Sequence, residues 1–269
     1  MELSTLLGLI FGFGMLLFGF LLEGGEMHAL FLLAPAIIVF GGTMGAILVS
    51  YNMKDVKRLP QLVMSTMTAH KSSEDELIDA FVRLGESARK EGLLSLEGIV
   101  DKEYGSKFDP MLKEGVKMVV DGTDADLVKS MFENELYIHD QLRKNEASMF
   151  EAAGGYSPTM GIIGTVMGLV HVLGNLSSPE ELSKSIAGAF IATLYGVCFA
   201  NLVYLPMASK LKQKAKQETI ERQLIMEGVL SIQAGENPSI IRRKLQTFKT
   251  EDRDKSIEAA PVEGAELNG

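Results

Sequence analysis

The stretch GGYSPTMGIIGTVMGLVHVLGN, residues 154–175, decides the fold class of this chain. Six of its 22 residues are glycine, one is proline, and none carries a fixed charge. Glycine and proline disfavour a helix in water by about 1 and about 3 kcal/mol per interior position. The stretch is nevertheless apolar and long enough to cross a membrane, which takes about 20 helical residues for about 30 Å of hydrocarbon. We therefore interpret it as part of a membrane-spanning helix.

Three other windows of the chain are equally free of charge. The 269 residues are 46% hydrophobic and 23% charged, with a mean hydropathy of +0.15, so charged and apolar residues must occupy separate segments. No Asp, Glu, Lys or Arg occurs in four windows: Leu3–Leu22, Met27–Met53, Ala152–Pro179 and Ser185–Ser209. Each window is long enough for one crossing. The sequence predicts an all-α integral membrane protein with four transmembrane helices.

The basic residues near the span ends predict the orientation. The turn Glu23–Glu26, between the first two spans, contains no Lys or Arg, and residues 176–184, between the last two, contain only Lys184. The second and fourth spans, in contrast, are each followed by a basic cluster: Lys54, Lys57 and Arg58, then Lys210, Lys212, Lys214 and Lys216. Because cytoplasmic loops carry the excess of Lys and Arg, both termini and the central region are predicted to be cytoplasmic.

The segments outside the spans read as helical and divide the chain further. An amphipathic helix is predicted to begin after Thr123 as N-cap, and a shorter one at Pro238 after Asn237 as N-cap. We predict a large helical cytoplasmic region between spans 2 and 3 and a helical cytoplasmic C-terminal segment. The predicted parts are a transmembrane hairpin at 1–53, a cytoplasmic helical region at 54–151, a second hairpin at 152–209, cytoplasmic helices at 210–248 and a disordered tail at 249–269.

Composition and motifs exclude several classes of function. The chain has no P-loop, no GxGxxG followed by an acidic partner, and no Cys/His spacing typical of a metal site. Its single cysteine, Cys198, lies inside the fourth window and cannot form an intramolecular disulfide. Acidic residues outnumber basic ones in the central region, which argues against nucleic-acid binding. We expect no catalytic residues, no metal and no cofactor.

The polar groups within the spans suggest the wall of an ion pathway. No span contains a carboxylate, although ion carriers normally place an ionisable group at membrane depth. Hydroxyls at Thr165 and Thr193 are the candidates for lining a wet path, though most intramembrane threonines bond only to the preceding turn. Any ion-binding acid must then come from another polypeptide. Gly161, Gly164 and Gly168 are candidates for close helix packing, because small residues let helices approach in lipid.

Four segments carry a resemblance to a known family. YSPTMGIIGTVMGLV (156–170) and AFIATLYGVCFANLVYLP (189–206) resemble the last two spans of the MotA family, the larger stator subunits of the bacterial flagellar motor. ExbB and TolQ subunits share a similar first segment. SARKEGLLSLE (87–97) resembles a cytoplasmic motif of the MotA family and separates the two, and EGVLSIQAGENPSIIRRKL (227–245) matches its C-terminal pattern.

The resemblance implies a mechanism and partners. In that family five copies surround two copies of a single-span partner, MotB, which supplies the ion-binding aspartate, and ion flow drives torque on the rotor protein FliG. It implies a homopentamer that forms the ion pathway together with MotB. The single hydroxyl at Thr193, preceded by Ala192, favours H⁺ as the ion, with Na⁺ left open. By matching positions the resemblance makes Arg89 and Glu97 rotor contacts, which the neighbouring Lys90 and Glu86 would share. Pro158 and Pro206, near the cytoplasmic ends of spans 3 and 4, would be the mechanical coupling residues.

Two alternatives remain open on the sequence. One is an ExbB/TolQ-like subunit that energises envelope transport, and the other is a membrane scaffold without ion flux. Each candidate residue also has a simpler role: glycines that only pack helices, prolines that only mark span ends, and charges that form a solvated face.

Overall fold

The structure, a computed structural model, describes residues 3–68, 74–104, 107–174 and 179–249, without the side chains of residues 179–181 and 184. Every element within those residues is a helix or a helical turn. Four helical segments are long and apolar enough to cross a membrane: Leu3–Leu22, Met27–Ser50, Ala125–Gly174 and Ser185–Gln233. The predicted all-α fold with four spanning helices is confirmed.

The chain divides into two compact units. The membrane unit comprises residues 1–70 and 141–215, and the second unit comprises residues 71–140 and 216–269. Two long helices contribute residues to both, α9 (Ala125–Gly174) and α11 (Leu205–Gln233). At 50 residues, α9 is about 75 Å long, far more than a bilayer crossing requires.

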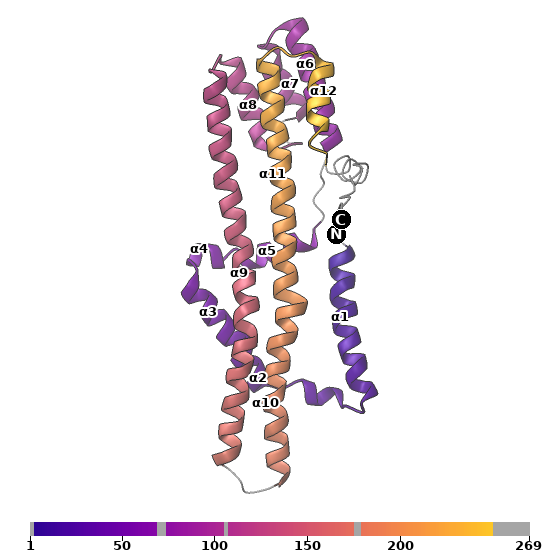
Figure 1. Ribbon diagram of the computed structural model, residues 1–269, viewed down its shortest axis with the longest axis vertical. Helices are drawn as coiled ribbons and strands as arrows, with labels where there is room; N and C mark the ends of the chain where they lie inside the picture. The colour runs from indigo at the N-terminus through magenta and orange to yellow at the C-terminus, as the bar shows by residue number, and fades with distance from the viewer. Residues whose placement is uncertain (1–2, 69–73, 105–106, 175–178, 250–269) are drawn as a thin grey trace, which may run out of the picture. The chain divides into compact units, whose positions relative to one another are not determined.

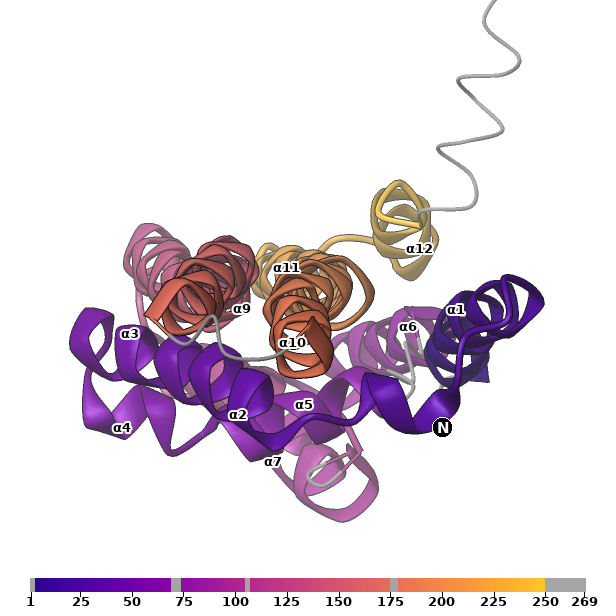
Figure 2. The same ribbon diagram turned by 90° about the horizontal axis from the view of Figure 1, so that it is seen from below.

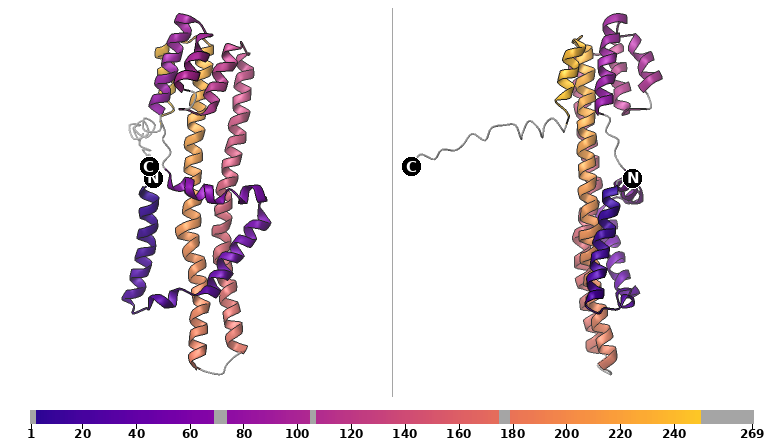
Figure 3. Two further views of the ribbon diagram at one scale, coloured as in Figure 1. Left: turned by 180° about the vertical axis from the view of Figure 1, so that it is seen from behind. Right: turned by 90° about the vertical axis from the view of Figure 1, so that its right-hand side faces the viewer.

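The membrane unit is built around α9 and α10 (Pro179–Phe199), which run side by side (Figures 1 and 3). The second span is broken into a 3₁₀ turn at Met27–Leu30, α2 (Leu33–Ala36), a π-helical turn at Ile37–Gly41 and α3 (Gly42–Ser50). Figure 2 shows α2 and α3 along one side of the α9–α10 pair. Two short helices, α4 (Met53–Val56) and α5 (Leu59–Met67), follow the span.

The first span, α1 (Leu3–Leu22), has no buried residue, as expected for a helix that faces lipid within this chain. It is attached by aromatic contacts: the ring centroids of Phe13 and Phe199 lie 5.6 Å apart. The ring of Phe199 in turn packs edge-on against Phe40 of the second span, at 4.6 Å. Aromatic side chains thus connect the first, second and fourth spans.

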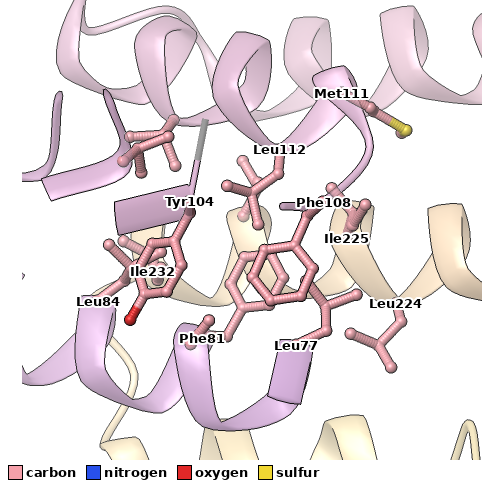
Figure 4. Close-up of a cluster of buried hydrophobic side chains, with 14 of the residues drawn as sticks. Leu77, Phe81, Leu84, Tyr104, Phe108, Met111, Leu112, Leu224, Ile225 and Ile232 are labelled. Atoms are coloured by element: carbon pink, nitrogen blue, oxygen red, sulfur yellow. The ribbon is translucent and has the colours of Figure 1, made fainter. Parts of the chain in front are cut away.

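The second unit has a dense apolar core (Figure 4). It is formed by α6 (Glu74–Glu91), α7 (Ser95–Ile99), a π-helical turn at Val100–Tyr104, α8 (Pro110–Val120), parts of α9 and α11, and α12 (Pro238–Gln246). Phe81 is fully buried, and a Cβ on Gly228 would meet its ring at 2.6 Å. The absence of a side chain at Gly228 lets α11 approach α6 closely.

Of the two predicted N-cap residues, one is confirmed and the other is wrong. Asn237 is confirmed as the N-cap of α12, since its side chain accepts a hydrogen bond from Ser239 N. The prediction for Thr123 is wrong by one residue: Asp124 Oδ1 accepts from the backbone N–H groups of Asp126 and Leu127. A carboxylate is favoured there because it also interacts with the positive end of the helix dipole. Residues 250–269 of the predicted tail lie outside the described residues.

Candidate functional site

Three glycines of α9 pack against three small residues of α10, and together they form a seam within the membrane unit. The α10 residues are Ala189, Ala192 and Gly196. A Cβ on Gly161 would lie 2.8 Å from Ala192 O, one on Gly164 would lie 2.7 Å from Ala192 Cβ, and one on Gly168 would lie 2.8 Å from Ala189 Cβ. On the opposite helix, a Cβ on Gly196 would lie 2.5 Å from Ser157 O. The predicted packing glycines therefore lie against the fourth span of their own chain.

This close approach brings Thr165 and Thr193 together, at the same level of the seam. Their hydroxyl oxygens are 2.6 Å apart, although the residues are 28 positions apart in the sequence. Thr165 Oγ1 also lies 2.8 Å from Ala189 O and 3.1 Å from Gly161 O. A hydroxyl donates only one hydrogen bond, so when Thr165 donates to a carbonyl, Thr193 donates to Thr165 and keeps an oxygen lone pair available. Both side chains are half-buried.

Pro158 lies at the crossing of the two helices. It is inside α9, and its Cα would be 3.1 Å from a Cβ on Gly196. The preceding Ser157 is fully buried and donates its hydroxyl hydrogen to Gly196 O at 3.0 Å. Pro158 therefore lies against the fourth span at a point where the backbones are almost in contact.

Pro206 follows an irregular turn. The segment Ala200–Tyr204 is π-helical, and the N–H of Leu205 donates to Ala200 O, five residues back. Proline has no N–H and crowds the carbonyl four residues earlier, so a wider turn before it accommodates the ring without ending the helix. A π turn also marks a position where a helix can change its hydrogen-bond register.

Tyr195 holds the broken entrance of the second span. Its hydroxyl accepts from Leu32 N at 3.1 Å and donates to Leu30 O. Both backbone groups lie where the 3₁₀ turn ends and α2 begins, so neither has the partner that a continuous helix would give it. A missing backbone bond is expensive in lipid. Sequence reasoning missed Tyr195, because nothing local shows that it reaches residues more than 160 positions away.

The predicted rotor-contact residues lie around the α6–α7 connection of the second unit. Arg89, Lys90 and Glu86 are on the last two turns of α6, and Glu97 is on α7 after the turn at Gly92 (φ +86°). All four are exposed, and no ion pair of theirs occurs among the described residues. Leu94, between them, is 78% exposed, a feature that charge patterning did not reveal.

A charged cluster holds α12 to the end of α11 in the second unit. Lys244 Nζ lies 2.9 Å from Glu227 and 2.8 Å from Glu236. The hydrogen bond from Lys244 lowers the pKa of Glu236, and the bonds to Glu236 and Glu227 raise the pKa of Lys244. Because α12 packs on α6, the cluster helps to support the helix that carries Arg89.

No group of three or more His, Cys, Asp or Glu side chains is placed to hold a metal within the described part of the chain. The candidate site in the membrane unit is therefore a pair of hydroxyls between two spans. In the second unit it is a surface of exposed charges around the α6–α7 connection.

Comparison with known proteins places these features in a family. The sequence model of the MotA/TolQ/ExbB proton channel family matches residues 105–224, and that of the Motility protein A N-terminal region matches residues 6–92. Motility protein A of Bacillus subtilis is 34% identical over 99% of this chain and 98% of its own length. Chemotaxis protein PomA of Vibrio alginolyticus is 34% identical, over 94% of this chain and 97% of its own.

Two solved structures share the fold. The flagellar MotAB stator complex from Bacillus subtilis matches with a TM-score of 0.84 and 34% identity, covering 93% of this chain and 98% of that one. The C. jejuni MotAB structure matches with a TM-score of 0.87 and 28% identity, covering 94% and 97%.

Proposed function

Since this chain belongs to the MotA/TolQ/ExbB proton channel family and is a stator subunit of the flagellar motor, we propose that the seam between α9 and α10 borders its ion pathway. The matched N-terminal region is that of Motility protein A, which disfavours the ExbB/TolQ-like alternative. The observation that carries the proposal is the pair of touching hydroxyls, Thr165 and Thr193, in spans that contain no carboxylate.

The partner must supply the titrating acid. Solved relatives are complexes of MotA with MotB, and we propose that five copies of this chain surround a MotB partner whose aspartate approaches the Thr165–Thr193 pair. The oxygen left free on Thr193 can order a water molecule or accept a hydrogen bond beside that acid. No residue of this chain need ionise for the ion to pass, and we infer no catalytic role for it.

We propose that the transported ion is H⁺. The hydroxyl oxygens already bond to each other and to carbonyls, an arrangement suited to a chain of hydrogen bonds. A sodium ion would need several oxygens turned toward it at once. One charge crossing about 150 mV releases about 3.5 kcal/mol, enough to drive a conformational step without a nucleotide.

Torque would pass from the spans to the rotor through the long helices. We propose that Pro158 and Pro206 are the points where helix movement reaches the cytoplasmic region, and that Arg89, Glu97, Lys90 and Glu86 contact FliG. This assignment requires both termini and residues 54–151 to be cytoplasmic, as the basic residues after the second and fourth spans predict.

Flux measurement tests the pathway. The chain is reconstituted with its MotB partner in liposomes, and an H⁺ or a Na⁺ gradient is imposed in turn. We expect flux with H⁺ alone. Flux that requires Na⁺ would overturn the choice of ion, and no flux with either ion would favour the scaffold alternative.

A further inference from the structure

The length of the second span determines how deep in the membrane the following helix, α4, lies. Helix α3 ends at Ser50 and α4 begins at Met53, so only two residues separate them. A crossing segment of 24 residues, Met27–Ser50, ends where hydrocarbon gives way to headgroups. We therefore place helix α4 at headgroup depth.

One side of the segment after the second span is attached to α9 within the membrane unit. The hydroxyl of Tyr51 donates to Ser148 Oγ at 3.2 Å, and Asn145 Nδ2 donates to Asp55 Oδ2 at 3.4 Å. Arg58 forms an ion pair of 2.7 Å with Glu146, whose side chain is only 6% exposed. Tyr51, Asp55 and Arg58 thus face α9, and the acidic residue of α4 is turned inward with them.

The other side carries two exposed lysines. Lys54 and Lys57 are exposed, and among the described residues neither forms an ion pair or a side-chain hydrogen bond. Other basic residues at this end are engaged within the membrane unit: Lys212 with Glu151, and Lys214 with the carbonyls of Ser65 and Thr68. Lys54 and Lys57 therefore place two exposed positive charges on α4 and the residue that follows it.

Exposed apolar side chains lie close to these lysines in the sequence. Val49, in the last turn of α3, is 90% exposed, and Met53 at the start of α4 is 58% exposed. Apolar side chains followed by lysines suit the boundary between acyl chains and phosphates. The apolar side chains contact the acyl chains, and each lysine extends its ammonium group to the headgroups. The surface formed by Val49, Met53, Lys54 and Lys57 is called the basic shelf below.

We propose that the basic shelf binds the phosphate groups of anionic phospholipids at the cytoplasmic face of the membrane. This assignment rests on the orientation given in the proposed function, and it adds a lipid partner to the stator. Charge complementarity and direct continuity with a spanning helix favour lipid over a neighbouring copy of this chain. Each lysine near an anionic surface contributes a factor of roughly five in affinity, so both together contribute roughly 25-fold.

The test is lipid retention by the intact complex. The purified full complex is equilibrated in nanodiscs of phosphatidylcholine containing a fixed fraction of phosphatidylglycerol, and the bound lipids are counted by native mass spectrometry. We expect enrichment of phosphatidylglycerol by the unaltered complex, loss of most of it in Lys54→Gln/Lys57→Gln, and retention in Lys54→Arg/Lys57→Arg. The matched control, Lys102→Gln/Lys117→Gln, removes two exposed charges of the second unit and should leave the enrichment unchanged.

Two results would overturn the proposal. One is equal enrichment in the glutamine variant and the unaltered complex. The other is dissociation of the glutamine variant into smaller oligomers with no change in lipid preference, which would assign the basic shelf to contacts between copies. Neither result involves ion flux or motility, so the proposed function would stand.

Discussion

The hydroxyl oxygens of Thr165 and Thr193 lie 2.6 Å apart across the α9–α10 seam, beside the carbonyls of Gly161 and Ala189. Along a seam formed mainly by glycine and alanine, the two spans thus bring two side-chain hydroxyls into contact. In lipid such a contact is too small to account for helix association, which here comes from close backbone packing. We therefore assign the hydroxyl pair a role in binding a water molecule or an ion along the pathway.

Replacing Thr193 separates this role from packing. Thr193→Val keeps the shape of the side chain, and Thr165 keeps its hydrogen bond to Ala189 O, so the complex should assemble. Loss of one hydrogen bond in the pathway should slow ion flux by about tenfold or more. Thr193→Ser, which restores a hydroxyl, should recover most of the flux in the same liposome assay. Equal flux in the valine and threonine forms would remove the hydroxyl from the pathway.

Charge reversal at Arg89 tests the rotor contact. The side chain is exposed and has no ion pair among the described residues, so Arg89→Glu should leave assembly intact and lower the torque of tethered cells. Charges that steer a partner need not stabilise their own fold. Lys117→Glu, at an exposed lysine elsewhere in the second unit, is the control. Normal torque in the Arg89→Glu/Glu97→Lys double variant would count heavily against the assignment.

The glycine seam predicts a contrast between two positions of α9. A Cβ on Gly161 would lie 2.8 Å from Ala192 O and 3.0 Å from Thr193 Cα, whereas a Cβ on Gly155 would meet nothing within 4 Å. Gly161→Ala should force the spans apart and lower the melting temperature of the purified complex. Gly155→Ala should be neutral or slightly stabilising, because alanine is the better helix former by about 1 kcal/mol. Equal melting temperatures for the two variants would mean that the seam tolerates a methyl group.

The hydroxyl of Tyr195 should matter more than its ring. Tyr195→Phe keeps the stacking on Phe40 but leaves Leu32 N–H and Leu30 C=O without their partner. Buried polar groups left unpaired cost about 1–3 kcal/mol, so the complex should melt at a lower temperature. Tyr137→Phe, at a side chain that is 66% exposed, is the control and should have no effect. Unchanged melting of Tyr195→Phe would show that other groups satisfy the break in the second span.

The Glu236–Lys244 contact should give the second unit a small pH dependence. Since the pKa of Glu236 is lowered in the folded chain, its contribution is present above the ordinary glutamate value and is lost as the pH falls through the lowered pKa. The contribution is at most about 1 kcal/mol, because the pair is partly exposed. Glu236→Gln should melt below the unaltered chain at neutral pH, and the gap should close in acid. A gap that does not change with pH would exclude the ion pair as its cause.

The sequence was sufficient for the spans because charge is absent from them and concentrated at their ends. It was also sufficient for Asn237, whose capping signal is local. It could not show that Thr165 meets Thr193, because that contact depends on how Gly161 and Gly196 set the crossing of α9 and α10.

Other features depend on contacts distant in sequence. Tyr195 is the clearest case, since an apolar window gives no sign that a tyrosine satisfies the backbone of another span. The π turn before Pro206 was also not predicted, although a proline inside a spanning helix is a signal for such an irregularity. Asp109 followed by Pro110 is a start signal for α8 that the sequence reading overlooked.

The most direct test of the stator assignment is a clean deletion of the gene, scored by electron microscopy for filaments and by video tracking for swimming. We predict cells with normal filaments that do not rotate, and recovery of swimming when the unaltered gene is returned. Cells that lack the gene, contain no second stator set and still swim would contradict the account.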